Sequence, residues 1–226
     1  MTDNYRQKLA SECLGTLLLV ATVVGSGIIA ENLSQGSIAL ALLANTVATG
    51  AILYVLITVL GPVSGAHLNP AVSMVFALRG ELGWLAGLGF VLAQVSGGIA
   101  GTLLAHAMFA EPLLQFSGHA RTGAAQWLSE AVATFALVLT ILGTVRHRPD
   151  ATPMAVALVI TAGYWFTAST SFANPAVTIA RSLTDSFSGI APIDAAGFVL
   201  AQLAGALVAL GVAHFVFGWR AIAGQD

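Results

Sequence analysis

Charged side chains are confined to short segments of this chain, and the tracts between them are long and apolar. A membrane-spanning helix needs about 20 mostly apolar residues. Tracts of that kind predict six spanning helices, at about 9–29, 37–60, 82–109, 124–145, 154–169 and 193–217. Helices are expected because a backbone in lipid must satisfy its own hydrogen bonds, and the alternating pattern of a membrane β-barrel is missing from the sequence.

One uncharged tract has an unusual length. Residues 32–78 are 47 positions without Asp, Glu, Lys or Arg, too many for one span and too few for two spans with a loop. The tract fits one span, a break at Gly61-Pro62, and a half-length helix over 70–78. Nine helical residues rise about 14 Å, roughly half of a hydrocarbon core of about 30 Å. A second half-length segment is expected over about 174–183.

Both half-length segments begin with Asn-Pro-Ala. Asparagine suits the cap position of a helix and proline the first helical position. Two such helices that meet at mid-membrane would bring about +0.5 charge each to the centre. The residues of the two triplets are Asn69, Pro70, Ala71, Asn174, Pro175 and Ala176.

The small residues before each triplet would leave backbone carbonyls free to accept hydrogen bonds from a passing solute. These residues are Gly65, Ala66, His67 and Leu68 in the first half, and Thr170, Ser171, Phe172 and Ala173 in the second. The pattern predicts a passive, cation-repelling path, with no nucleophile, metal site or cofactor.

The chain also repeats itself. The segment that starts at Glu12 parallels the one that starts at Glu130, and Phe-Val-Leu-Ala-Gln occurs at both 90–94 and 198–202. Each half holds three full spans, an odd number, so the second half must enter the membrane inverted. The expected organisation is one channel domain, 1–226, with inverted repeats at about 1–118 and 119–226.

Composition supports a membrane location. The chain is 57% hydrophobic and only 8% charged, whereas soluble domains are about 25% charged. Lipid is therefore the expected partner, and the net charge of −2 argues against nucleic acid. The single cysteine, Cys13, excludes an intramolecular disulfide and a cysteine metal cluster.

Positive charge predicts the orientation. In this topology one side of the membrane holds six basic residues: Arg6, Lys8, Arg79, Arg146, Arg148 and Arg220. The other side holds only Arg121 and Arg181. The positive-inside rule then places both termini in the cytoplasm.

The stretch Ser-Gly-Ala-His-Leu-Asn-Pro-Ala-Val-Ser at 64–73, the second triplet and the paired Glu and Ala-Gln spans resemble the major intrinsic protein family of aquaporins and aquaglyceroporins. The resemblance covers nearly the whole chain. It implies an all-α membrane protein with six transmembrane helices plus two re-entrant half-helices, one pore per subunit and a homotetramer in the plasma membrane. It also implies that Glu12 and Glu130 anchor the half-helix loops; a proton relay is the alternative for these buried acids.

The resemblance also implies an outer selectivity filter of four positions. Carried over by spacing, they are Thr49, Ala162, Ser171 and Val177, with Gly163 as an alternative register for Ala162. The family usually has arginine where this chain has Val177, which implies a wide, arginine-free filter. Arg181, four residues further on, either compensates for the missing charge or lies near the lipid headgroups.

Residues 164–167, followed by the stretch Ser-Phe-Ala-Asn-Pro-Ala-Val-Thr-Ile-Ala-Arg at 171–181, resemble bacterial inner-membrane channels associated with arsenic resistance. This implies passage of water and small neutral solutes such as glycerol, arsenite or methylated arsenicals. The side chains of Tyr164, Trp165 and Phe166 could form a solute cage or an interfacial belt. An ion-coupled secondary transporter built from inverted repeats is the alternative function.

Overall fold

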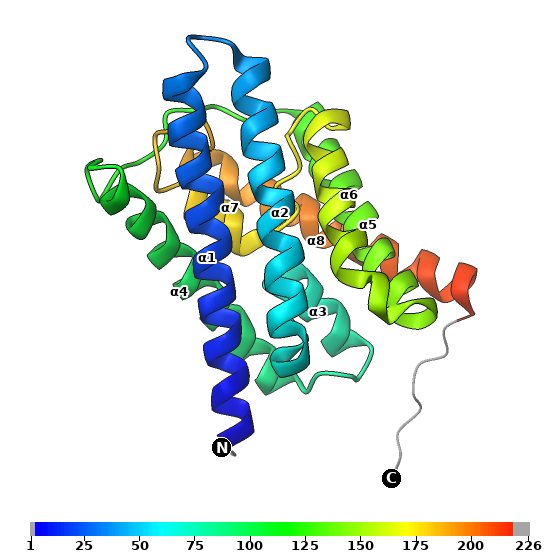
Figure 1. Ribbon diagram of the computed structural model, residues 1–226. Helices are drawn as coiled ribbons and strands as arrows, with labels where there is room; N and C mark the ends of the chain where they lie inside the picture. The colour runs from blue at the N-terminus through cyan, green and yellow to red at the C-terminus, as the bar shows by residue number, and fades with distance from the viewer. Residues whose placement is uncertain (1–2, 219–226) are drawn as a thin grey trace.

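The computed structural model describes residues 3–218, and the regular elements of this part of the chain are helices (Figure 1). In order they are α1 (Asp3–Leu33), α2 (Ile38–Ser64), α3 (Pro70–Leu78), α4 (Trp84–Met108), α5 (Ala124–His147), the 3-10 turn η1 (Pro149–Ala151), α6 (Thr152–Phe166), α7 (Pro175–Arg181) and α8 (Pro192–Phe217). Five of them, α1, α2, α4, α5 and α8, are long and apolar enough to cross a membrane. The prediction of an all-α, multi-pass membrane protein is confirmed.

Helix α6 completes the outer shell of the bundle with these five long helices, and it is shorter than its predicted span. Its 15 residues rise about 22 Å, and it lies against α2 and α5. The helix ends at Phe166 because Thr167 adopts an extended conformation. The chain then turns inward toward the second triplet.

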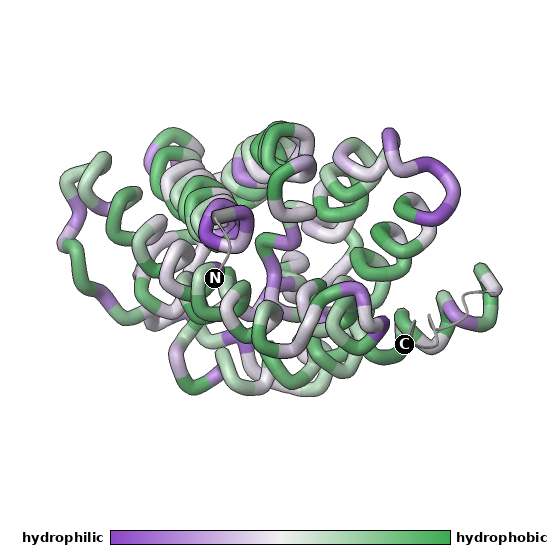
Figure 2. The backbone as a smooth tube through the Cα atoms, turned by 90° about the horizontal axis from the view of Figure 1, so that it is seen from below, coloured by the Kyte–Doolittle hydropathy of each residue, from purple (hydrophilic) through white to green (hydrophobic). Residues whose placement is uncertain are grey.

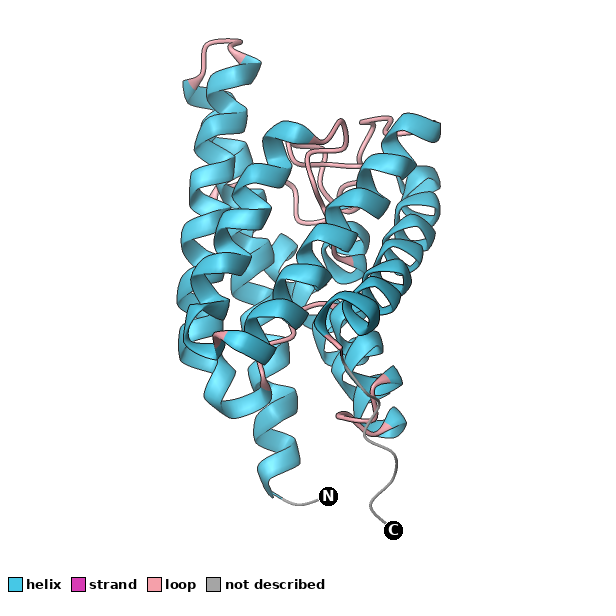
Figure 3. Cartoon of the chain, turned by 90° about the vertical axis from the view of Figure 1, so that its right-hand side faces the viewer, coloured by secondary structure: helices cyan, strands magenta, loops and turns pink. Residues whose placement is uncertain are grey.

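The two half-length helices lie inside the shell. α1 packs along α4 and α2, and α5 packs along α8 and α6. In Figure 1, α3 occupies the end of the bundle near the N-terminus, and α7 lies toward the opposite end. Figure 3 shows loop segments inside the helical shell at the end opposite the N-terminus. The half-helices therefore approach the middle of the bundle from opposite ends.

Glycines allow the tightest helix pairs to form at matching places in the two halves. A Cβ on Gly97 of α4 would overlap the backbone carbonyl of Cys13, and one on Gly205 of α8 would overlap that of Ala131. Each partner residue directly follows a buried glutamate. Gly211, also on α8, makes no such close contact, because nothing described lies within 4 Å of a Cβ there.

The expected break at Gly61-Pro62 was wrong, because α2 continues to Ser64. Proline in the last turn of a helix removes one N–H hydrogen bond without ending the helix there. The helix ends at Gly65, which has φ 89° and donates its N–H to the carbonyl of Gly61 at 2.9 Å. Glycine adopts this left-handed conformation without steric cost.

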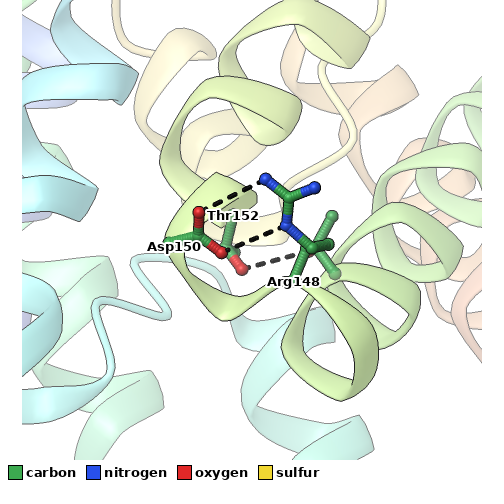
Figure 4. A network of polar contacts seen from close by, with 4 residues as sticks. Arg148, Asp150 and Thr152 are labelled. Atoms are coloured by element: carbon green, nitrogen blue, oxygen red, sulfur yellow. Dashed lines mark hydrogen bonds and ion pairs between the residues drawn. The ribbon is translucent and has the colours of Figure 1, made fainter.

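The turn between α5 and α6 is exposed and carries an ion pair between Arg148 and Asp150 (Figure 4). The Arg148 guanidinium donates to Asp150 at 3.4 and 3.5 Å, and both side chains are more than 70% exposed. Hydrogen bonds and the positive charge of Arg148 lower the pKa of the Asp150 carboxyl. An ion pair this exposed contributes little to stability.

Apolar side chains face outward and polar ones gather inside, the reverse of a soluble protein. The tube in Figure 2 is mostly apolar around its rim, with a hydrophilic stretch in the middle. Leu85, Ile193 and Phe215 are each more than 85% exposed, whereas the side chains of Glu12 and Glu130 are fully buried. Lipid is the solvent that suits this surface.

Candidate functional site

Both asparagines of the triplets cap the half-length helices. The Ala71 N–H donates to Asn69 Oδ1 at 2.9 Å. In the second half the N–H groups of Ala176 and Val177 donate to Asn174 Oδ1 at 3.0 and 3.3 Å. Each cap satisfies backbone donors that a helix N-terminus otherwise leaves open. The proline that follows each cap is buried, as is the alanine after it.

The same two asparagines link the halves of the molecule. Asn69 Nδ2 donates to the carbonyl of Ala173 at 2.8 Å, and Asn174 Nδ2 donates to the carbonyl of Leu68 at 2.7 Å. Each amide group keeps a second N–H. Both asparagines line the central cavity, so these second N–H groups can face a passing solute.

The loops before the triplets have unusual backbones. Ala66 and Leu68 have φ of 46° and 48°, and Ser171 and Ala173 have φ of 53° and 48°. The left-handed conformation costs about 1–2 kcal/mol for a residue with a Cβ atom. Such loops persist only where neighbouring groups hold them.

Glu12 holds the first loop. Its Oε1 accepts from Ser64 Oγ at 2.6 Å and from the His67 N–H at 3.0 Å. Its Oε2 accepts from the Leu68 N–H at 2.6 Å and from Gln94 Nε2 at 2.7 Å.

Glu130 holds the second loop in the same manner. The N–H groups of Phe172 and Ala173 donate to its two oxygens, each at 2.9 Å. Gln202 Nε2 donates to Oε2 at 2.6 Å and to Thr178 Oγ1 at 2.8 Å. Each of these hydrogen bonds to the two carboxylates is one that an ionised carboxylate accepts.

A cavity of about 100 Å³ runs past the two caps. The residues that the sequence analysis predicted for the pore and that line this cavity are Gly65, Ala66, His67, Leu68, Asn69, Ser171, Phe172, Ala173, Asn174, Thr49 and Val177. Thr170 is half-buried and is not part of this lining. Apolar side chains such as Val23 and Ile160 form much of the remaining wall.

The structure does not place Ala162 in the cavity. Ala162 is exposed and shares the outward face of α6 with Leu158 and Met154, four and eight residues earlier. Gly163, the alternative register, is buried, and a Cβ on it would lie 2.5 Å from Ser171 Oγ. The rotation of α6 therefore turns Ala162 away from the position that spacing alone assigned to it.

Tyr164 takes the place on α6 that faces the cavity. It is 3% exposed, and its hydroxyl lies 3.1 Å from Thr49 Oγ1. Trp165 and Phe166 are 51% and 57% exposed and point outward. Of the three consecutive aromatic residues, only Tyr164 joins the lining.

The cavity wall also includes an arginine that lies outside the four expected filter positions. Arg181, the last residue of α7, is 2% exposed and belongs to the cavity wall. Its Nε donates to the carbonyl of Ser188, and its guanidinium carbon lies 3.4 Å from the ring centre of Phe172. The sequence signal for this placement was the four-residue spacing from Val177, which left the direction of the side chain open.

His67 lines the opposite part of the cavity. Its Nδ1 lies 3.1 Å from Ser73 Oγ, and its ring packs 4.7 Å from that of Phe76 and 5.4 Å from that of Phe90. These contacts fix the ring in one orientation beside the first loop.

The arrangement is that of a channel, and comparisons with known proteins agree. The sequence model described as "Major intrinsic protein" matches residues 1–170. The chain is 60% identical over 213 residues to Aquaglyceroporin AqpS of Rhizobium meliloti (strain 1021), covering 94% of this chain and 91% of that protein. It is 33% identical over 193 residues to the glycerol uptake facilitator protein of Streptococcus pneumoniae (strain ATCC BAA-255 / R6), covering 75% and 79%.

Among solved structures, the X-ray structure of the aquaglyceroporin from Plasmodium falciparum matches with a TM-score of 0.72. That match covers 94% of this chain and 97% of the other at 21% identity, which shows a shared fold. Taken with the capped half-helices and the cavity between them, these similarities show that the chain belongs to the major intrinsic protein family and is a passive membrane channel, not an enzyme.

Proposed function

We propose that this channel conducts water together with small neutral polar solutes, namely glycerol, arsenite or methylated arsenicals. The observation that carries the proposal is the composition of the cavity wall. Val177 occupies the position where the family usually has arginine, beside Thr49 and Ser171. Small side chains at these positions favour solutes larger than water. Two similar proteins are named an aquaglyceroporin and a glycerol uptake facilitator, which supports glycerol.

The electrostatics of the cavity favour neutral solutes. Both half-helices direct their N-termini to the centre, where each brings about half a positive charge. Proton and cation exclusion by the ends of half-helices is a known use of this arrangement. A neutral solute can exchange hydrogen bonds with the asparagine amides without an ionic desolvation cost.

We also propose the setting of the channel. It assembles as a homotetramer in the bacterial inner membrane, with both termini in the cytoplasm. Arg6, Arg79 and Arg148 belong to the end of the bundle that would face the cytoplasm, and Arg121 and Arg181 belong to the other end. Arg220, which also entered the charge count, lies outside the described residues. The exposed apolar faces of the helices would contact lipid or neighbouring subunits.

A solute panel in proteoliposomes tests the proposal. Stopped-flow light scattering would record vesicle shrinkage and recovery with water, glycerol, urea, arsenite and methylated arsenicals. We expect Val177→Arg to lower glycerol permeability about tenfold, equivalent to about 1.4 kcal/mol of added barrier, with water flux retained. Val177→Leu is the matched control for bulk without charge. If Val177→Arg leaves the flux of large solutes unchanged, Val177 does not form the constriction.

The same vesicle assay distinguishes a channel from an ion-coupled transporter. Flux through a channel rises linearly with solute concentration and ignores sodium and proton gradients. Saturation at millimolar solute together with dependence on an ion gradient would favour the transporter instead.

A further inference from the structure

Arg181 is an unusual residue for the interior of a membrane protein. Its side chain is 2% exposed, and it makes no ion pair with a carboxylate among residues 3–218. A buried charge without a counter-ion is expensive, so other groups must compensate it. The structure supplies three: the Ser188 carbonyl, the face of Phe172, and the C-terminal end of α7, which ends at this residue.

The remaining donors of Arg181 are open to the cavity. Only Nε has a hydrogen-bond acceptor within the described chain. The two terminal nitrogens, Nη1 and Nη2, are not among the fully buried atoms without a partner, and the residue lines the cavity. The terminal edge of the guanidinium, with its two parallel N–H groups, therefore faces solutes in the cavity.

The position suits a filter. Arg181 lies one helical turn beyond Val177 on the same face of α7, toward the end of the bundle opposite the N-terminus. The Phe172 ring supports the guanidinium, and the Phe172 N–H is itself bound by Glu130. The charge is thus held by the same network that shapes the second loop, so its place in the cavity is fixed.

We propose that Arg181 is the specificity-determining cation of this channel, displaced by one helical turn from the family's usual position. Its charge excludes cations at the outer part of the pore. Its two terminal N–H groups bind solutes that carry paired oxygen atoms, such as vicinal diols, in preference to solutes with a single oxygen such as urea. The preference for solutes with paired oxygen atoms rests on the proposed passage of polar solutes. The exclusion of cations requires only a water-conducting channel.

Two substitutions separate charge from hydrogen-bond geometry. Arg181→Gln removes the positive charge. Arg181→Lys keeps the charge but loses the pair of parallel N–H donors. In proteoliposomes we expect Arg181→Gln to raise potassium leak about tenfold, and Arg181→Lys to leave it near the wild-type level. The ratio of glycerol to urea permeability should fall about threefold in both variants.

Arg121 provides a matched control. It also lies over Phe172, at 5.1 Å, but its Nε and Nη1 donate to the carbonyls of Gly189 and Ser169, and it is not in the cavity wall. We expect Arg121→Gln to leave potassium leak low. An equal rise in Arg121→Gln and Arg181→Gln would overturn the proposal, because the barrier would then belong to the loop as a whole.

Water flux shows whether each variant is folded. If Arg181→Gln conducts water and its potassium leak is unchanged, the charge barrier is contradicted. If Arg181→Lys keeps the ratio of glycerol to urea permeability, the preference for paired oxygen atoms is contradicted. If neither variant conducts water, the unaltered channel is measured instead, and a potassium flux as fast as its urea flux overturns the charge barrier at Arg181. An unaltered channel that passes water but no glycerol contradicts the proposed function, while the potassium measurement still tests Arg181.

Discussion

At the residue scale, Glu12 and Glu130 organise the two loops because a carboxylate only accepts hydrogen bonds. Each faces two backbone N–H groups and a glutamine amide, and both are fully buried. The residues on which they act include Leu68 and Ala173, whose left-handed backbones would not persist unsupported.

We predict that Glu130→Gln destabilises the protein although it preserves size. The new NH₂ group would face the donors of Phe172, Ala173 or Gln202 and leave at least one of them unsatisfied. The expected loss is about 2–4 kcal/mol, with a marked fall in water flux. Thermal unfolding in detergent and stopped-flow shrinkage would measure the two effects.

Glu31→Gln is the control for that change. Glu31 also accepts a backbone N–H, from Phe187 at 2.9 Å, but it is exposed at the end of α1. Water can replace the lost bond there, so we expect a change within about 0.5 kcal/mol. Equal effects of the two substitutions would show that burial is not what makes Glu130 necessary.

At the element scale, close pairs of long helices set the shape of the shell. α8 approaches α5 at Gly205, where a Cβ would overlap the Ala131 carbonyl, and α4 approaches α1 in the same way at Gly97. Small residues at such contacts let two backbones approach within lipid, where the hydrophobic effect does not drive helix association.

We predict that Gly205→Ala costs about 1–3 kcal/mol, because the added methyl group must push α8 away from α5. Gly211→Ala, in the same helix, meets nothing within 4 Å and should be neutral or stabilising by up to about 1 kcal/mol through helix propensity. Thermal midpoints of the two variants provide the comparison. A stable Gly205→Ala protein would show that the α5–α8 contact is not tight.

At the scale of the whole molecule, the two halves are joined at the centre by reciprocal hydrogen bonds. Asn69 and Asn174 each cap one half-helix and donate to the loop of the other half. The cap and the link depend on different atoms of the same amide. Loss of the donor alone should therefore separate the two roles.

We predict that Asn174→Asp keeps α7 capped, because aspartate is an equally good cap, but breaks the link to the Leu68 carbonyl. Two acceptors would face each other at a cost of about 1–3 kcal/mol. The negative charge would also offset the helix dipoles, so cation leak in proteoliposomes should rise.

Asn32→Asp makes the same change at an exposed position on α1 and should alter neither property. If Asn174→Asp is as stable as the unaltered channel and has the same low cation leak, the hydrogen bond between the halves is unimportant.

The sequence by itself determined the elements and the order in which they cross the membrane. Spans follow from local hydropathy, and the start of α3 at Pro70 and of α7 at Pro175 follows from cap chemistry, which depends on neighbouring residues alone. The paired glutamates and Ala-Gln segments could be located for the same reason, since a repeat is visible in sequence.

Only the tertiary structure decided which side chains face the pore. Spacing placed Ala162 in the filter, but α6 is rotated by its packing on α2 and by the close approach of Ser171 to Gly163, so Tyr164 faces inward. The direction of Arg181 depends on Phe172 and on the Ser188 carbonyl, which belong to two different loops. Helix rotation and the reach of a long side chain are set by such distant partners, and local sequence does not encode them.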